Sequence, residues 1–376
     1  MKIAVLKETK SGERRVSLSP ESVKKLRGKG PEVVVQAGAG ASAGFFDKDY
    51  TDAGASIEAS ADALLGAADL VVKINAPTPD EIAKTKPGAG FVSLLFPLVN
   101  TELVKSMNAR SLTAISLDRV PRTTLAQSMD VLSSQATCAG YRAVIIAAEN
   151  MPKLAPMLMT AAGRIDPARF VILGAGVAGL IAIGIARRLG AVVEAYDVRA
   201  VVKEQVESLG ASFIDVGEQA DAQTAGGYAK EISAEQQARI NTKIADHLAK
   251  ADVCITTALI PGRPAPKLIT AEMARRMRPG SIIIDMAAEQ GGNCVLTKPG
   301  ETTDVDGVKI LGPTNLASDV PRDSSAMFSR NVEKLVSYIL AKDGTMNYDF
   351  GKEIIKGCVV THGGKVVDEQ VAGLLK

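Results

Sequence analysis

The feature that most constrains the fold of this chain is an apolar run that leads directly into three closely spaced glycines. Residues 170–173 are all apolar, which is typical of a strand buried on both faces of a sheet. Gly174, Gly176 and Gly179 follow at once, and residues 180–189 have the apolar composition of a buried helix. This order of strand, tight turn and helix predicts the first unit of an α/β domain with a parallel sheet.

The residues after this helix predict a binding site for a dinucleotide. A second predicted strand, residues 191–196, ends at Asp197, 18 positions after Gly179. A carboxylate there can accept hydrogen bonds from both ribose hydroxyls of adenosine and repels a 2′-phosphate, so NAD is favoured over NADP. Arg199, two residues later, could soften that preference. The glycines let the backbone approach a pyrophosphate, to which the helix N-terminus presents N–H groups.

Composition excludes several other classes of function. The 44 Lys and Arg residues nearly balance the 42 Asp and Glu residues, and tryptophan is absent, so a nucleic-acid-binding surface is not expected. The four cysteines form no CxxC pair and there are only two histidines, so we expect no metal, no disulfide framework and no Ser-His-Asp triad. Residues 170–186 are uncharged, but 17 residues that include turn glycines are too few for a membrane span. We therefore expect a cytoplasmic protein with reduced thiols.

Apolar periodicity predicts two α/β domains. Strands at 3–6, 33–35, 70–74, 91–96 and 112–117 alternate with helices, the first of which is opened by Ser19 as N-cap and by Pro20. A second α/β unit runs from 170 to about 315, a helix with one apolar face follows at 327–339, and residues 354–367 resemble a hairpin. We predict that this helix returns to the first domain. The expected architecture is two Rossmann-like domains with parallel sheets, 1–133 with 320–376 and 134–319, with NAD(H) in the cleft between them.

A polar stretch at residues 122–134 stands out from these apolar patterns. We expect a helix that begins near residue 127 and carries Gln127, Asp130, Ser133 and Ser134 on one face. A solvated helix face is the simpler interpretation of such a stretch. Its position between the two predicted domains also fits a pocket for a nicotinamide ring.

Together these motifs resemble the NAD(H)-binding subunit of proton-translocating nicotinamide nucleotide transhydrogenases. The resemblance covers almost the whole chain and rests on residues 122–135, the Gly174 turn and residues 197–199, 224–230, 256–262 and 284–293. It implies an enzyme that is complete only with its partners: hydride passes directly between NAD(H) bound here and NADP(H) on a partner subunit, and membrane-spanning subunits couple this exchange to proton movement. It also implies a homodimer that is peripheral on the inner face of the cytoplasmic membrane.

The resemblance implies roles for individual residues. Arg122, Gln127, Asp130 and Ser133 would hold the nicotinamide with its ribose and pyrophosphate, and the first three would be the catalytic set. Residues 224–238 would form a mobile loop that closes over NAD(H). The other dinucleotide contacts would come from the turn glycines and from Val177, Asp197, Val198, Arg199, Gly227, Tyr228 and Leu259. Direct hydride transfer requires positioning and exclusion of water rather than a general acid, so no histidine is needed.

Two other functions remain open from the sequence. Alanine dehydrogenases share much of the pattern, and Arg15 and Lys73 match positions where that family binds its substrate. However, Phe96 stands where those enzymes carry their catalytic histidine, and Glu289 replaces an aspartate. Reduction through an imino acid needs proton transfer, which phenylalanine cannot provide, so Arg15 and Lys73 are interpreted as structural ion-pair residues or as remnants of a shared ancestry. The second alternative is a non-catalytic NAD(H) sensor, which would bind NADH tightly without turnover.

Overall fold

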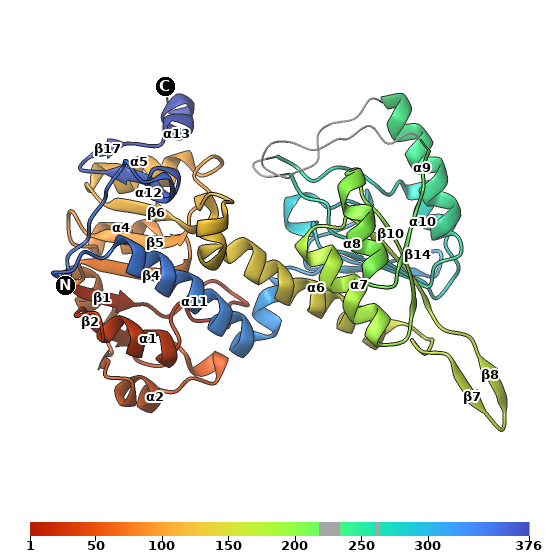
Figure 1. Ribbon diagram of the computed structural model, residues 1–376, viewed down its shortest axis with the longest axis horizontal. Coiled ribbons are helices and arrows are strands. Elements are labelled where there is room, and N and C mark those ends of the chain that lie inside the picture. Colours follow the sequence, from red (N-terminus) through yellow and green to blue (C-terminus); the bar gives the residue numbers. More distant parts are fainter. Residues whose placement is uncertain (218–233, 261–262, 376) are drawn as a thin grey trace. The chain divides into compact units, whose positions relative to one another are not determined.

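The computed structural model describes residues 1–217, 234–260 and 263–375, which fold into two compact units (Figure 1). Unit 1 comprises Met1–Gln135 and Ala317–Lys376, and unit 2 comprises Ala136–Leu316. The chain thus divides at 135/136 and 316/317, where the sequence placed the divisions at 133/134 and 319/320. One helix, α6 (Val131–Asn150), contains the first division.

Unit 1 is built on a mainly parallel sheet. Its strands are β1 (Lys2–Val5), β2 (Glu32–Gln36), β3 (Ser56–Glu58), β4 (Leu70–Asn75), β5 (Gly90–Leu94), β6 (Thr113–Ser116), β16 (Val359–His362) and β17 (Lys365–Val366). They lie in the order β17-β16-β6-β5-β4-β1-β2-β3, and only β16 and β17 run antiparallel to their neighbours. The helices of this unit are α1 (Pro20–Arg27), α2 (Asp47–Asp52), α3 (Ala61–Ala67), α4 (Pro79–Lys84), α5 (Thr101–Ala109), α11 (Pro321–Ile339), α12 (Glu353–Cys358) and α13 (Glu369–Leu374).

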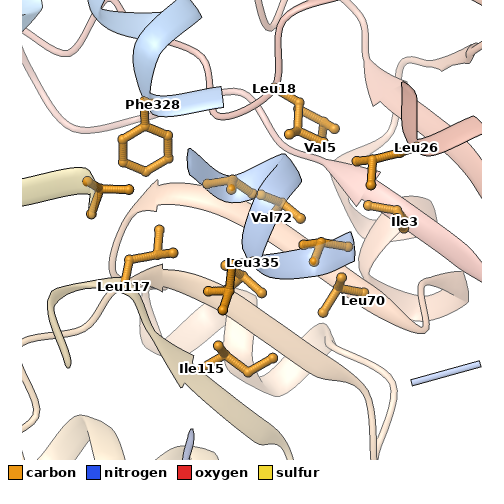
Figure 2. Packing of buried hydrophobic residues seen from close by; sticks show 14 of the residues in the cluster. Ile3, Val5, Leu18, Leu26, Leu70, Val72, Ile115, Leu117, Phe328 and Leu335 are labelled. Atoms are coloured by element: carbon orange, nitrogen blue, oxygen red, sulfur yellow. The ribbon is translucent and has the colours of Figure 1, made fainter. Parts of the chain in front are cut away.

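The apolar strands of unit 1 are explained by burial on both faces of the sheet. Ile3 and Val5 pack into one core and Ala4 and Leu6 into the other, because successive strand residues point to opposite faces. In the first of these cores, Phe328 and Leu335 of α11 meet residues of the central strands (Figure 2). The prediction that the late helix returns to the first domain is therefore confirmed. Ser19 also caps α1 as predicted.

Unit 2 has a second sheet with the strand order of a dinucleotide-binding fold. Its strands are β9 (Arg169–Leu173), β10 (Val192–Tyr196), β11 (Ser212–Phe213), β12 (Val253–Thr256), β13 (Ile282–Asp285), β14 (Thr302–Val305) and β15 (Val308–Leu311). The order is β11-β10-β9-β12-β13-β15-β14, and only β14 is antiparallel. Helices α6, α7 (Val177–Arg188) and α8 (Lys203–Ser208) cover one face, and α9 (Ala234–Leu248) and α10 (Ala271–Arg275) cover the other. The chain reverses direction across the sheet between β9 and β12, where such folds bind ligands.

The predicted helix through residues 127–149 is wrong at its start. Residues Thr124–Met129 form a short 3-10 helix, η3, and Asp130 has extended backbone angles before α6 begins at Val131. The Asp130 carboxylate accepts hydrogen bonds from the backbone N–H and the hydroxyl of Ser133, at 3.0 and 2.7 Å. An aspartate that caps a helix in this way ends the preceding turn, so Gln127 does not share a helix face with Asp130 and Ser133.

Three further segments differ from their predictions. The hairpin at the end of the chain is confirmed for β16 and β17, but residues before it form the helix α12, since Ile354, Ile355 and Cys358 bury one helical face. The predicted loop 224–238 lies outside the described residues up to 233, and α9 already begins at Ala234. The sequence did not predict β7 (Leu158–Thr160) and β8 (Gly163–Ile165), an antiparallel hairpin that stands out from unit 2 (Figure 1).

A helix can span a bilayer only if it is long enough and apolar enough. Within residues 1–217, 234–260 and 263–375, no helix combines the length and the apolar composition needed to span a membrane.

Candidate functional site

The turn after β9 requires glycine at its first position. Gly174 has a left-handed φ of +102°. Its N–H donates to the carbonyl of Tyr196 at 2.8 Å, and its own carbonyl accepts from Oγ1 of Thr257 at 3.0 Å. A Cβ atom at Gly174 would lie 2.5 Å from that hydroxyl. The turn is therefore bound to both neighbouring strands and excludes any side chain at this position.

The other two glycines of the turn have different surroundings. A Cβ at Gly179 would lie 1.9 Å from the carbonyl oxygen of Gly174, so only glycine lets α7 pack against the turn. At Gly176 a Cβ would have no atom within 4 Å among the described residues. Gly176 is also the N-cap of α7, and a glycine has no side chain with which to cap the helix. The N-terminus of α7 thus presents open backbone and N–H groups that have no partner within the helix, which is the arrangement that binds phosphates.

Asp197 lies at the end of β10, directly beside this turn. Its Oδ2 accepts from the backbone N–H of Ala175 at 2.7 Å and from Arg199 Nη2 at 2.8 Å, and its Oδ1 accepts from Nε of Arg199 at 2.8 Å. The hydrogen bond to Asp197 raises the pKa of Arg199. The sequence suggested Asp197 as a ribose ligand and Arg199 as a modifier of specificity. The structure shows in addition that the two side chains form an ion pair that anchors the turn.

The remaining predicted contacts of unit 2 lie around the ends of β9 and β12. Val177 and Leu259 are exposed, and Val198 is half-buried. Asn293 holds the loop after β12, since its side chain accepts from the N–H of Ala258 and donates to the carbonyls of Ala258 and Pro266, at 2.8 to 3.1 Å. No separate signal in the sequence pointed to this role of Asn293. Gly227, Tyr228, Pro261 and Gly262 lie outside the described residues.

The polar residues at 122–133 all belong to unit 1. Arg122 and Gln127 are exposed, whereas Asp130 and Ser133 are half-buried and bonded to each other. The backbone that carries them is fixed by packing, because Ala126 and Met129 are buried in the core beside α11. These residues thus form a surface loop with a packed base, referred to below as the 122–133 loop.

Unit 1 also contains a pocket of about 490 Å³ at the carboxyl ends of β1, β4 and β5. Its walls are formed by polar and apolar side chains of Glu8, Thr9, Lys10, Lys73, Asn75, Ala76, Thr78, Leu94, Phe96 and Asn100. Lys73 is buried and paired with both carboxylate oxygens of Glu81, at 2.7 and 2.9 Å. Burial raises the pKa of Glu8, although Lys73 opposes that shift. Phe96 has a φ of +46°, a conformation that a phenylalanine rarely adopts.

Arg15 does not line this pocket but is joined to it by hydrogen bonds. Its guanidinium is paired with Glu13 at 2.7 Å, and Nη1 donates to Oε1 of Gln135 at 2.7 Å. Asn75 Nδ2 bridges Glu13 and Glu8, at 3.1 and 3.0 Å. Burial would raise the pKa of Glu13, but the hydrogen bonds and charge of Arg15 outweigh it and lower the pKa to about 2. In the described part of the chain, no three His, Cys, Asp or Glu side chains are grouped so as to hold a metal ion.

Comparison with known proteins decides the family. Residues 4–139 match the alanine dehydrogenase/PNT N-terminal domain, and residues 143–369 match the alanine dehydrogenase/PNT C-terminal domain. The chain belongs to the alanine dehydrogenase/PNT family. It is 48% identical over 381 residues to the first part of the NAD(P) transhydrogenase alpha subunit of Rhodospirillum rubrum, with 99% of each chain covered. A crystal structure of transhydrogenase from Sinorhizobium meliloti matches with a TM-score of 0.86 and 41% identity over 98% of this chain and 99% of the other.

The alanine dehydrogenases of the same family are more distant relatives. The enzyme of Halomonas elongata is 32% identical over 332 residues, which cover 86% of this chain and 84% of the relative. Within the alanine dehydrogenase/PNT family, the chain is therefore more similar to transhydrogenase alpha subunits.

Proposed function

We propose that this chain is the NAD(H)-binding component of a transhydrogenase and that it exchanges hydride directly with NADP(H) held by a partner subunit. The observation that carries the proposal is the open, uncapped N-terminus of α7 at Gly176, with Asp197 beside it. This arrangement suits a dinucleotide pyrophosphate and ribose. The similarity to proteins named as transhydrogenase alpha subunits supports the choice of reaction.

The proposed contacts divide the dinucleotide between two sets of residues. In unit 2, the adenosine and pyrophosphate would be bound by Gly174, Gly176, Val177, Gly179, Asp197, Val198, Arg199 and Leu259, with Gly227 and Tyr228 as further contacts. In unit 1, Arg122, Gln127, Asp130 and Ser133 would hold the nicotinamide half. Gln127 is suited to this role because its exposed amide can donate to and accept from a carboxamide.

The proposed chemistry needs positioning rather than proton transfer. When bound, NADH supplies a hydride that is accepted by NADP⁺, so one nicotinamide is oxidised, the other is reduced and no proton is exchanged at the reacting carbons. The chain's part is to orient the ring and to exclude water. The Asp130–Ser133 hydrogen bond would keep the start of α6 in place for that role.

Amino-acid dehydrogenation is supported less well by the unit 1 pocket. Lys73 and Arg15 are already paired with Glu81 and Glu13, and Arg15 does not line the pocket. Phe96 cannot donate a proton. A reaction that relies on a proton donor at the position of Phe96 is therefore disfavoured.

We also propose a homodimer that associates with NADP(H)-binding and membrane-spanning subunits on the cytoplasmic face of a membrane. The β7–β8 hairpin and the residues before it support the dimer. Five large apolar side chains are exposed there, Leu154, Met157, Leu158, Met159 and Ile165. A two-stranded hairpin is only marginally stable alone, so burial against a second copy would stabilise it.

A hydride-transfer assay tests the proposed function. NADH and an oxidised nicotinamide analogue are mixed with the chain, with and without an NADP(H)-binding transhydrogenase subunit, and a parallel sample contains pyruvate and ammonia. Rapid transfer between nucleotides only when the partner is present is the expected result. NADH oxidation by pyruvate and ammonia would establish the dehydrogenase instead. Tight NADH binding without turnover in any sample would establish the sensor.

A further inference from the structure

We infer that Asn331, on α11, is a positioning residue for the 122–133 loop and thereby for hydride transfer; this inference rests on the proposed function. Asn331 lies about 200 residues after the loop in the sequence and belongs to none of the motifs described above. Its side-chain Nδ2 donates to the backbone carbonyl of Ser128 at 2.8 Å. Ser128 directly follows Gln127, so this bond acts on the backbone beside the proposed nicotinamide ligand.

The bond lies where the loop backbone most needs an external partner. Ser128 is the penultimate residue of η3, and the chain leaves helical geometry at Asp130. Carbonyls at the end of a helix have no partner further along the same helix, so they depend on other groups. Asn331 supplies such a group from a different element.

Apolar packing holds the same stretch against α11 on either side of the bond. Ala126 and Met129 of η3 lie in one core with Phe328 and Val332, which are the neighbours of Asn331 on α11. A second polar contact follows at the start of α6, where Gln135 Nε2 donates to the carbonyl of Ser324, also on α11, at 3.1 Å. The helix α11 thus holds the middle of the loop and the first turn of α6 that follows it.

The amide at position 331 carries a cost in stability that its bond to Ser128 must offset. Asn331 is 9% exposed, and its Oδ1 is buried without a hydrogen-bond partner among the described residues. A buried acceptor without a partner destabilises a fold, and an apolar side chain of the same size would remove that cost. The amide is therefore better explained by the position it imposes on Ser128 and Gln127.

The variant Asn331→Leu separates positioning from stability. It removes the donor to Ser128 and the unpaired oxygen while keeping the branched shape and the number of heavy atoms of the side chain, so we expect only a small change in Tm. With the NADP(H)-binding partner present, kcat for hydride transfer should fall about tenfold while KM for NADH changes less than about twofold, because ring placement is lost rather than nucleotide affinity.

Ser329→Ala is the matched control on the same helix. Ser329 bonds to the backbone N–H and the hydroxyl of Ser19, at 2.7 and 3.1 Å, away from the loop. This variant should lower Tm and leave kcat unchanged. Equal losses of kcat in the two variants would show a general packing effect and overturn the inference.

Amide hydrogen exchange gives a second readout that does not depend on activity. Residues 124–130 should exchange faster in Asn331→Leu than in the wild type, with no such change in Ser329→Ala. The role of Asn331 would be overturned by unchanged exchange in Asn331→Leu. It would also be overturned if the wild-type complex is active and Asn331→Leu has the same kcat. If the wild-type complex transfers no hydride, the proposed function fails, whereas the exchange result still decides whether Asn331 holds the loop.

Discussion

At the scale of single residues, buried partners decide which charged side chains remain available for chemistry. Arg15 and Lys73 are the cations that the sequence singled out in unit 1, and each is paired with a glutamate at 2.7 Å. The Glu13 side chain is fully buried in its pair. Breaking such a pair leaves an uncompensated buried charge, so these residues contribute to the fold whatever the pocket binds.

The Glu13–Arg15 pair predicts a specific pH dependence of stability. A pKa near 2 in the folded chain, against an ordinary 4.5, corresponds to about 3 kcal/mol at neutral pH. Because the folded pKa is lowered, this contribution is present above pH 4.5 and is lost as the pH falls towards 2. Glu13→Gln should therefore lower the free energy of unfolding by about 3 kcal/mol at pH 7 and by roughly half as much at pH 3. Urea unfolding of both proteins across this range measures the difference, and a difference independent of pH would contradict the assignment.

At the scale of elements, the strand β9, its glycine turn and α7 form one motif in which the three glycines have different surroundings. Gly174 and Gly179 serve the packing of the unit, since a Cβ at either position would clash with Thr257 or with the turn itself. Gly176 has open space around it and is not needed for packing. The three glycines of one motif therefore separate into two positions that packing requires and one that borders open space, where we propose that the dinucleotide binds.

Two alanine variants test that separation. Gly179→Ala should destabilise the chain by about 3 kcal/mol or more, because the new Cβ meets backbone that cannot move aside. Gly176→Ala should leave Tm nearly unchanged but weaken NADH binding about tenfold or more, because the methyl group would occupy the approach of the pyrophosphate. Thermal unfolding and fluorescence titration with NADH distinguish the two effects. Wild-type NADH affinity in Gly176→Ala would place the dinucleotide elsewhere.

At the scale of the whole molecule, the β7–β8 hairpin is a part of the described chain whose side chains are not buried against the rest of it. All six residues of its strands are exposed, and Met159 is 72% exposed. An apolar arm of this kind is typical of a contact between proteins. The proposed homodimer gives the arm a partner in a second copy.

The dimer is tested by placing a charge on that arm. Met159→Asp should convert the dimer to a monomer, because burying a carboxylate in an apolar contact is costly, while the fold of each unit is kept. Light scattering during size-exclusion chromatography at several concentrations measures the mass. Phe46→Asp is the matched control, since Phe46 is similarly exposed, at 62%, on unit 1. A monomeric wild type, or equal dissociation in both variants, would remove the hairpin from the interface.

The sequence by itself determined the features that a short segment carries alone. The turn at Gly174 was predictable because its left-handed φ and the close approach at Gly179 demand glycine locally, whatever surrounds them. The two parallel sheets were predictable because strands buried on both faces must be apolar at every position. The single apolar face of α11 predicted a helix that packs on a core.

Only the tertiary structure decided which polar groups meet, whether they are two positions apart, as Glu13 and Arg15 are, or about 200 apart, as Ser128 and Asn331 are. Asp130 interrupts the expected helix through its bond to Ser133, Glu13 and Glu81 neutralise the two cations of unit 1, and Asn331 reaches the loop from a distant helix. Hydrogen bonds and ion pairs of this kind depend on distances of about 3 Å between atoms. Sequence spacing does not encode such distances when the partners are brought together by the packing of separate elements.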